Sequence, residues 1–153
     1  MMSDKRIEIV ELSQEDLDAV AEIEKETFSL PWSRQSFADA IEDSFGLFLV
    51  ARTLEEKQVL GYIGMYCTAE EGEITNVAVK SEARGQGIGG CLVDAMIREA
   101  QTRGIPRIVL EVRVSNTPAI ATYENRGFIN LGVRKNFYQL PREDAYIMVR
   151  EEK

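Results

Sequence analysis

Apolar and polar residues follow one another along the first third of the chain with the periods of a short strand and two helices. Apolar positions at 7–12 predict a strand, and an apolar stripe at helical spacing over residues 17–28 predicts a helix. Pro31 ends this helix, because proline disfavours helical geometry in the residue before it. Ser33 can then cap a second short helix that carries Phe37 on its inner face.

The middle and last parts of the chain predict a mixed sheet. An antiparallel meander is indicated by three apolar runs with polar turns between them, at about 45–53, 58–67 and 72–79. After residue 80 the pattern predicts helices at about 87–103 and 117–126, and strands at 107–112, near 128–133 and near 144–150. A strand, a helix and a strand joined by so long a crossover indicate parallel pairing. With no repeat or linker, we expect residues 1–153 to form one α/β domain.

The charge balance limits what the protein can bind. Its 153 residues include 18 Lys and Arg but 26 Asp and Glu, for a net charge of −8, and no stripe of basic residues offsets the excess. Binding to nucleic acid through phosphate contacts is therefore not expected. The first residues are polar, and no window approaches the roughly 18 apolar residues of a membrane helix, so we expect neither an export signal nor a membrane span.

The absence of histidine restricts the chemistry. It removes the usual general base, the Ser-His-Asp and Cys-His pairs and nearly every catalytic zinc site. Acid-base steps must then use carboxylates, Tyr, Cys, Lys or water. Cys67 and Cys91 show no metal-ligand spacing, and a chain of this size needs no disulfide, so we expect no metal and a reducing cytoplasm. We expect Cys91 to be a small buried core residue.

A glycine-rich turn follows the apolar run that ends at Val79. It reads Arg-Gly-Gln-Gly-Ile-Gly-Gly from Arg84 to Gly90 and opens a helix. Glycines let the backbone approach a ligand closely, and the N–H groups of a first helical turn attract anions. Arg84 adds a positive charge, so the turn suits a pyrophosphate. A glycine turn with no ligand is the alternative interpretation of the same pattern.

The same residues satisfy the dinucleotide fingerprint G-x-G-x-x-G across Gly85, Gly87 and Gly90. The context does not fit that fold, because five residues separate Val79 from Gly85 and too little chain follows Gly90 for the rest of a doubly wound domain. A P-loop is also disfavoured, since no Gly-Lys-Ser/Thr follows.

Arg84-x-x-Gly87-x-Gly89 after an apolar strand resembles the acetyl-CoA motif of the GNAT superfamily of N-acetyltransferases. The resemblance covers about residues 6–150. Within the superfamily the chain is most similar to the ribosomal-protein alanine N-acetyltransferases, through runs at residues 110–116, 119–128, 134–138 and 143–145. Several separate runs in the right order are more specific than the glycine turn alone.

The resemblance implies a fold, a cosubstrate and an acceptor. The fold is a mixed, mostly antiparallel sheet of about seven strands flanked by about four helices. Acetyl-CoA would donate its acetyl group, in a ternary complex, to the N-terminal alanine α-amine of small-subunit ribosomal protein eighteen. The enzyme would be a monomer or a weak dimer. The implied cofactor contacts are the backbone of Val77, Ala78 and Val79 and the side chain of Asn116 for pantetheine, and Arg84, Gly85, Gln86, Gly87, Ile88, Gly89 and Gly90 for the pyrophosphate.

Two residues are candidates for the acid-base steps, and each has a plainer interpretation. Glu111 interrupts an apolar strand, and the pattern alone favours a strand-end carboxylate that lies at the surface or pairs with Arg113 or Arg107. Tyr123 lies in a helix whose start is set by small capping residues and a proline, and the pattern alone favours a core aromatic. The resemblance instead implies that Glu111 is the general base and that Tyr123 protonates the departing CoA sulfur.

Residues 29–33 and 134–142 are expected to form two walls of a peptide groove, with plain surface loops as the alternative. Two other functions stay open. The first is acetyl transfer to a small-molecule amine or a lysine side chain, because one fold serves many acceptors. The second is a non-catalytic acyl-CoA-binding module, which the presence of both Glu111 and Tyr123 disfavours.

Overall fold

The computed structural model describes residues 6–152, so the expectation based on the first residues of the chain lies largely outside the described part. A seven-stranded sheet has the order β1-β2-β3-β4-β5-β7-β6. Its strands are β1 (Ile7–Glu11), β2 (Gly46–Thr53), β3 (Val59–Cys67), β4 (Gly72–Val79), β5 (Arg107–Arg113), β6 (Ile129–Gln139) and β7 (Arg142–Glu151). The α-helices are α1 (Leu17–Thr27), α2 (Arg34–Glu42), α3 (Ile88–Thr102) and α4 (Thr117–Glu124).

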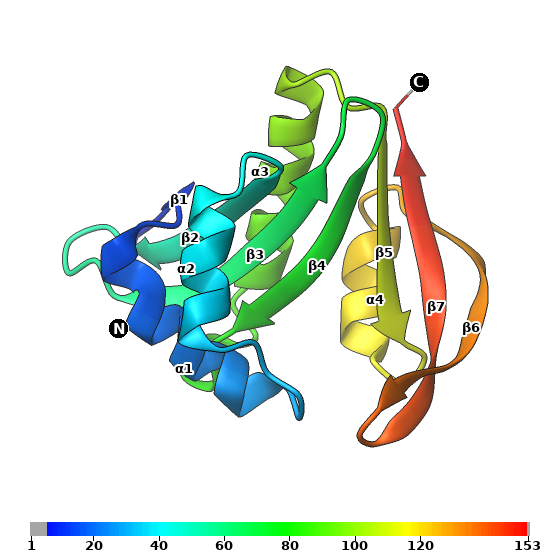
Figure 1. The fold of residues 1–153 in the computed structure, drawn as a ribbon, viewed down its shortest axis with the longest axis horizontal. Coiled ribbons are helices and arrows are strands. Elements are labelled where there is room, and N and C mark those ends of the chain that lie inside the picture. The colour runs from blue at the N-terminus through cyan, green and yellow to red at the C-terminus, as the bar shows by residue number, and fades with distance from the viewer. Residues whose placement is uncertain (1–5, 153) are drawn as a thin grey trace.

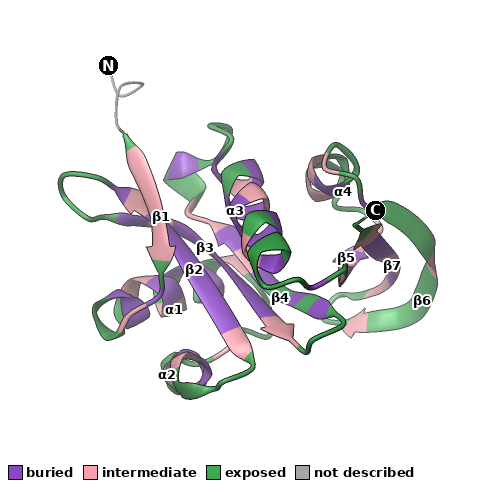
Figure 2. Ribbon diagram, turned by 90° about the horizontal axis from the view of Figure 1, so that it is seen from above, coloured by how far each residue is buried: buried purple, intermediate pink, exposed green. Residues whose placement is uncertain are grey.

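The helices cover the two faces of the sheet unequally. Helices α1 and α2 pack on one face of the β1–β4 half and α3 packs on the other, while α4 lies beside the β5–β7–β6 half (Figures 1 and 2). Two apolar cores result: one lies under α1 and α2 around Phe37 and Tyr62, and one lies between the sheet, α3 and α4 around Leu92 and Met96. No helix within residues 6–152 is long and apolar enough to cross a membrane.

The predicted mixed sheet is confirmed. All neighbouring strands are antiparallel except β4 and β5, which are joined by the α3 crossover and run parallel. The last hairpin is longer than predicted, because β6 reaches Gln139 and β7 begins at Arg142. A register shift between Arg134 and Tyr138 and a positive φ of 55° at Asn136 break the alternation there, which hides the strand from a period-two pattern.

The sheet opens between β4 and β5. These strands pair only through Gly72 with Ile108 and Glu73 with Val109, and beyond this point they diverge (Figure 1). On its other edge β4 carries an irregularity at the same level: the register with β3 shifts so that Thr75 has no partner. Such a bulge bends the strand that contains it, so β4 turns away from β5.

The hydrogen bond at the start of α2 agrees with the cap predicted there. The Ser33 hydroxyl accepts from the backbone N–H of Ser36 at 3.1 Å. The backbone N–H of Ser13 donates to the Asp16 carboxylate at 3.0 Å, across a short 3-10 turn that precedes α1. Each interaction satisfies an N–H at a chain reversal, which fixes where the following helix begins.

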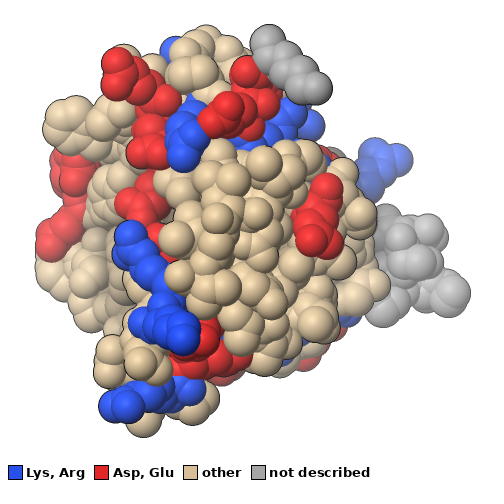
Figure 3. Space-filling model, turned by 90° about the vertical axis from the view of Figure 1, so that its right-hand side faces the viewer, with Lys and Arg blue, Asp and Glu red and all other residues tan. Residues whose placement is uncertain are grey.

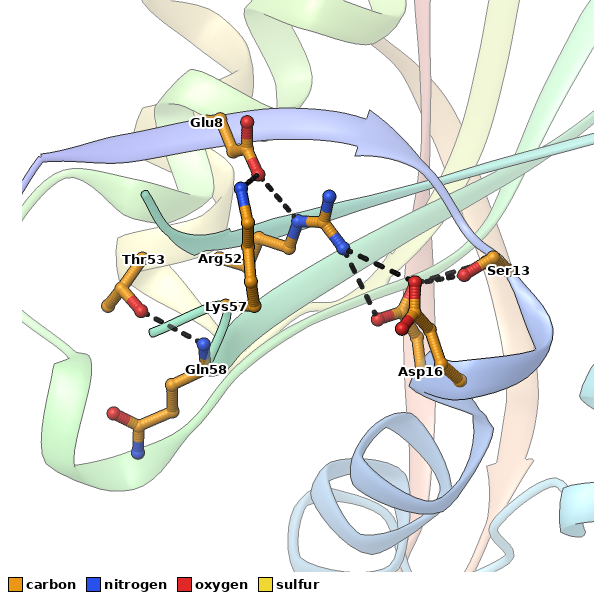
Figure 4. A network of polar contacts seen from close by, with 8 residues as sticks. Glu8, Ser13, Asp16, Arg52, Thr53, Lys57 and Gln58 are labelled. Atoms are coloured by element: carbon orange, nitrogen blue, oxygen red, sulfur yellow. Dashed lines mark hydrogen bonds and ion pairs between the residues drawn. The ribbon is translucent and has the colours of Figure 1, made fainter. Parts of the chain in front are cut away.

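A polar network fastens the edge strand β1 to β2 (Figure 4). The Arg52 guanidinium donates to Glu8 at 2.7 Å and lies 3.9 Å from the buried Asp16 carboxylate. Lys57 also donates to Glu8, at 3.0 Å. These two cations, Lys57 more than Arg52, lower the pKa of Glu8 below its usual value.

The lowered pKa makes the contribution of Glu8 to stability pH-dependent. A carboxyl group with a depressed folded-state pKa stabilises the fold above its unfolded-state pKa, and this contribution is lost as the pH falls through the folded-state value. Glu8→Gln should therefore lower the free energy of unfolding at about pH 7 and have little effect at about pH 2–3. Urea denaturation at several pH values measures both. Glu15→Gln is the matched control, because Glu15 is 78% exposed and 4.0 Å from Arg52; equal, pH-independent losses in both variants would contradict this account.

Candidate active site

A cleft of about 530 Å³ lies where the sheet opens. Its sides are residues 74–77 of β4 and residues 110–113 of β5. Residues of α4 close one end, and the α1–α2 loop (residues 28–33) and the β6–β7 turn (residues 137–141) form its outer walls. The volume is typical of small-molecule sites, and both predicted groove walls contribute to the lining.

Glu111 lies in the cleft on β5, with 14% of its side chain exposed. Burial raises the pKa of Glu111, the negative charge of Glu73 raises it further, and Arg134, 3.8 Å away, opposes the rise. A raised pKa makes the carboxylate a better proton acceptor. The pairing with Arg113 or Arg107 is wrong, because Arg113 pairs with Glu143 at 3.0 Å. Arg107 pairs with Glu71 and Glu151 instead.

Tyr123 enters the same cleft from α4. The predicted helix start is confirmed, because the Asn116 side chain accepts from the backbone N–H of Ala119 at 3.2 Å and Pro118 lies in the first turn. The ring is 7% exposed and packs on Phe128 with 5.5 Å between ring centroids. Burial raises the pKa of Tyr123, so its hydroxyl stays protonated near neutral pH. The residue is a core aromatic whose surface also lines the cleft.

The β6–β7 turn is held over the cleft by one arginine. The Arg113 guanidinium lies 4.2 Å from the centre of the Tyr138 ring and donates to the carbonyl of Pro141 at 2.9 Å. Burial raises the pKa of Tyr138 to about 12. The Ser29 hydroxyl donates to the carbonyl of Leu140, so the two outer walls touch.

The glycine-rich turn lies after β4, outside the lining of the cleft. Gly85 and Gly87 have φ values of 82° and 81°, which side chains rarely adopt, and a Cβ at either would meet no heavy atom within 4 Å. The turn is therefore open to a ligand. The Arg84 side chain donates to the carbonyl of Val79 at 3.0 Å, which holds its charge at the end of β4. Helix α3 begins directly afterwards, at Ile88.

Gly90 and Cys91 lie in the first turn of α3, and Cys91 differs from what the sequence suggested. A Cβ at Gly90 would lie 2.3 Å from the Arg126 guanidinium, which pairs with Asp94 at 2.8 Å, so this glycine makes room for a side chain of the chain itself. Cys91 is exposed, and the expectation that it is buried is wrong. It lies at the outward-facing position of the first turn of α3, where helical periodicity turns it away from the core.

Sequence reasoning missed a buried carboxylate that also lines the cleft. Glu24 of α1 is 2% exposed and accepts hydrogen bonds from the Trp32 backbone N–H at 3.0 Å, the Asn76 amide at 3.4 Å and the Tyr62 hydroxyl. A signal was present, because Glu24 lies four residues after the buried Val20, on the apolar face of the helix. An acidic residue at such a position requires hydrogen-bond donors.

The surface charge is mixed on the side of the molecule that carries β6. Figure 3 shows acidic and basic side chains next to one another around a largely uncharged centre, rather than a continuous basic surface. Exposed apolar residues of β6, Ile129, Leu131 and Val133, belong to this side. Across residues 6–152 no cluster of three or more Cys, Asp or Glu side chains is placed to hold a metal ion.

Comparison with known proteins identifies the class. Residues 17–128 match the acetyltransferase (GNAT) family. The chain therefore belongs to this family, and the predicted family and fold class are confirmed.

Relatives and solved structures agree with this assignment. The chain is 33% identical over 142 residues to the ribosomal protein bS18-alanine N-acetyltransferase of Escherichia coli, a match that covers 92% of this chain and 94% of that one. A Bacillus subtilis protein provisionally given the same name is 38% identical over 135 residues, or 88% of each chain. The crystal structure of the Escherichia coli enzyme superposes with a TM-score of 0.85 over 95% of this chain and 94% of that chain, at 33% identity.

The surroundings of Glu111 predict how its pKa responds to two substitutions. Arg134→Met removes the opposing positive charge and should raise the pKa of Glu111 further, whereas Glu73→Gln removes a negative charge and should lower it. The carboxyl carbon of Glu111, followed by NMR as the pH changes, measures both. Shifts of the same sign in the two variants would contradict this electrostatic account.

Proposed function

We propose that this protein transfers the acetyl group of acetyl-CoA to the N-terminal α-amine of a ribosomal protein that begins with alanine. The observation that carries the proposal is the cleft at the opening of the sheet, whose lining includes Glu111 of β5 and Tyr123 of α4. Membership of the acetyltransferase family and relatives named for the same acceptor support it. The net charge of −8 would also favour a basic ribosomal protein as partner.

The residues present fit acetyl-CoA. Beyond Glu73 the edge of β4 that faces β5 has no paired strand, so backbone groups of residues 77–79 on this edge could bond the pantetheine arm. The carbonyl of Val79 already accepts from Arg84. The open turn from Gly85 to Gly90 would hold the pyrophosphate on the first N–H groups of α3, beside Arg84. Asn116, at the rim of the cleft, would bond the far end of the pantetheine arm.

The chemistry then needs the incoming ammonium group to lose two protons and the departing sulfur to gain one. Acetyl-CoA supplies the thioester carbonyl and a thiol as leaving group. Glu111 takes a proton from the incoming ammonium group, directly or through one water, and the neutral amine attacks the carbonyl carbon. As the carbon–sulfur bond breaks, the nitrogen of the adduct loses its second proton to water, and the Tyr123 hydroxyl gives its proton to the sulfur, which leaves as the free thiol of CoA. Tyr123 then regains a proton from water. A backbone N–H of β4 would polarise the carbonyl oxygen.

An α-amine suits this base better than a lysine does. Its pKa is about 8, compared with about 10.4 for a lysine side chain, so less free energy is needed to expose the nucleophilic lone pair at neutral pH. Direct attack within a ternary complex is sufficient, and the proposed enzyme would act in the cytoplasm, where ribosomal proteins are made.

The acceptor class can be tested with two peptides. One begins with a free Ala and carries no lysine, and the other has a blocked N-terminus and free lysines. We expect mass spectrometry to show faster acetylation of the first peptide, with stoichiometric release of CoA. Faster acetylation of the blocked peptide, or of a small-molecule amine, would overturn the α-amine assignment in favour of another acceptor within the family. Binding of acetyl-CoA with no transfer to any amine would indicate a non-catalytic module.

The base and the acid should give different pH profiles. Glu111→Gln should lower kcat by about 10²- to 10⁴-fold near neutral pH, and the loss should shrink at high pH because the amine is then already neutral. Tyr123→Phe keeps the buried ring and should lower kcat by about 10²-fold, with little change in acetyl-CoA affinity and no recovery at high pH. Steady-state and single-turnover kinetics measure both variants.

If kcat of Glu111→Gln is reduced only slightly and equally at every pH, Glu111 is a structural residue and not the base. Near wild-type kcat in Tyr123→Phe, with chemistry shown to be rate-limiting, would return Tyr123 to a packing role and leave water as the acid. Acetyl-CoA affinity, measured by calorimetry, controls for folding in both variants.

A further inference from the structure

A buried polar chain links helix α1 to the place where the sheet opens. Glu24 is 2% exposed and its two carboxylate oxygens have different partners. One oxygen accepts from the backbone N–H of Trp32 at 3.0 Å, and the other accepts from the Tyr62 hydroxyl and from the Asn76 amide at 3.4 Å. Asn76 in turn accepts a hydrogen bond from the hydroxyl of Thr75 at 2.6 Å. Thr75 is the residue of β4 that has no partner in β3.

Glu24 therefore connects the side of the cleft proposed for the acceptor to the side proposed for acetyl-CoA. Trp32 belongs to the α1–α2 loop, which is an outer wall, whereas Asn76 directly precedes the stretch of β4 proposed to hold the cofactor arm. The wall is a coil with exposed residues such as Leu30, which is 65% exposed. Inside the protein it is held by this hydrogen bond and by the Trp32 ring, whose centroid lies 5.2 Å from that of Phe37.

The partners of Glu24 argue against a role in proton transfer. Both of its oxygens already accept hydrogen bonds from protein groups. Burial and the charge of Glu24 raise the pKa of Tyr62, so this phenol keeps its proton. The Glu24 side chain instead connects α1 to three other segments, because it bonds to the α1–α2 loop, to β3 and to β4.

We propose that Glu24 is a positioning residue for the acceptor: it fixes the α1–α2 loop against β4 at the distance that the incoming peptide requires. The identity of the acceptor rests on the proposed function. The tether, meaning the hydrogen bonds by which Glu24 joins Trp32 to Asn76, does not depend on it. Weakening the tether loosens the acceptor wall, so acceptor binding suffers first. The glycine-rich turn and α3 are not part of the chain of contacts, so acetyl-CoA affinity is largely retained.

Two conservative variants separate reach from charge. Glu24→Asp keeps the charge but retracts the carboxylate by one methylene, so it cannot meet all of its partners. Glu24→Gln keeps the reach and loses the charge; its amide oxygen can still accept from Trp32, and the Tyr62 hydroxyl can accept as well as donate. Glu22→Asp is the matched control, because Glu22 is an exposed residue of the same helix.

Trp32 is the one tryptophan in the chain, so its fluorescence reports on the wall without any assay of activity. We expect Glu24→Asp to make Trp32 more accessible to acrylamide quenching and to raise KM for the alanine peptide by about tenfold, with acetyl-CoA affinity within about twofold of wild type. Glu24→Gln should stay within about threefold of wild type in KM, and Glu22→Asp should match wild type.

The opposite order, with Gln more damaging than Asp, would show that the charge matters and would overturn the proposal. Unchanged Trp32 quenching in Glu24→Asp, or an equal loss of affinity for both substrates, would overturn it too. If the wild-type protein acetylates no alanine peptide, the proposed function fails, and the Trp32 quenching still decides whether Glu24 tethers the loop.

Discussion

The loss of pairing between β4 and β5 is the constraint on which the site depends. Only two residue pairs join these strands, from Gly72 to Ile108 and from Glu73 to Val109. Each strand is paired along its other edge, β4 with β3 except at Thr75 and β5 with β7 throughout, and helices pack against both halves of the sheet. Each strand therefore has a partner on its other edge, and the bulge at Thr75 bends β4 away from β5. An unpaired strand edge inside a protein needs a hydrogen-bonding partner, which a bound pantetheine arm would supply.

The opening also sets the electrostatics of the candidate residues. Glu111 and Tyr123 lie on elements that border it, partly removed from water, and burial raises the pKa of both. A raised pKa makes a carboxylate a stronger base and keeps a phenol protonated, so one physical effect would suit both proposed roles. The positive charge of Arg134 opposes this rise in the pKa of Glu111. A chain without histidine can thus provide a base and an acid from side chains outside their ordinary pKa range.

Local sequence signals were sufficient for the elements, the caps and the class of protein. The cap at Ser33, the proline-led start of α4 and the parallel crossover follow from short-range rules and were predicted. What could not be predicted depends on register between distant residues. The extension of β6 to Gln139 needs an irregular register, and the partner of Glu111 is Arg134 rather than a near neighbour in sequence. Glu24 was readable as an acidic residue on an apolar helix face, but its partners on other elements were not.

The central claim is that the two substrates meet where the sheet opens. A crystal structure with a conjugate of CoA and an alanine peptide, joined through an acetyl bridge from the sulfur to the α-amine, tests it directly. We predict that the pantetheine arm lies between β4 and β5 along residues 77–79, with the pyrophosphate on the turn from Gly85 to Gly90 and the bridge between Glu111 and Tyr123. A conjugate bound elsewhere, or a peptide that leaves the cleft without passing the α1–α2 loop and the β6–β7 turn, would contradict the account.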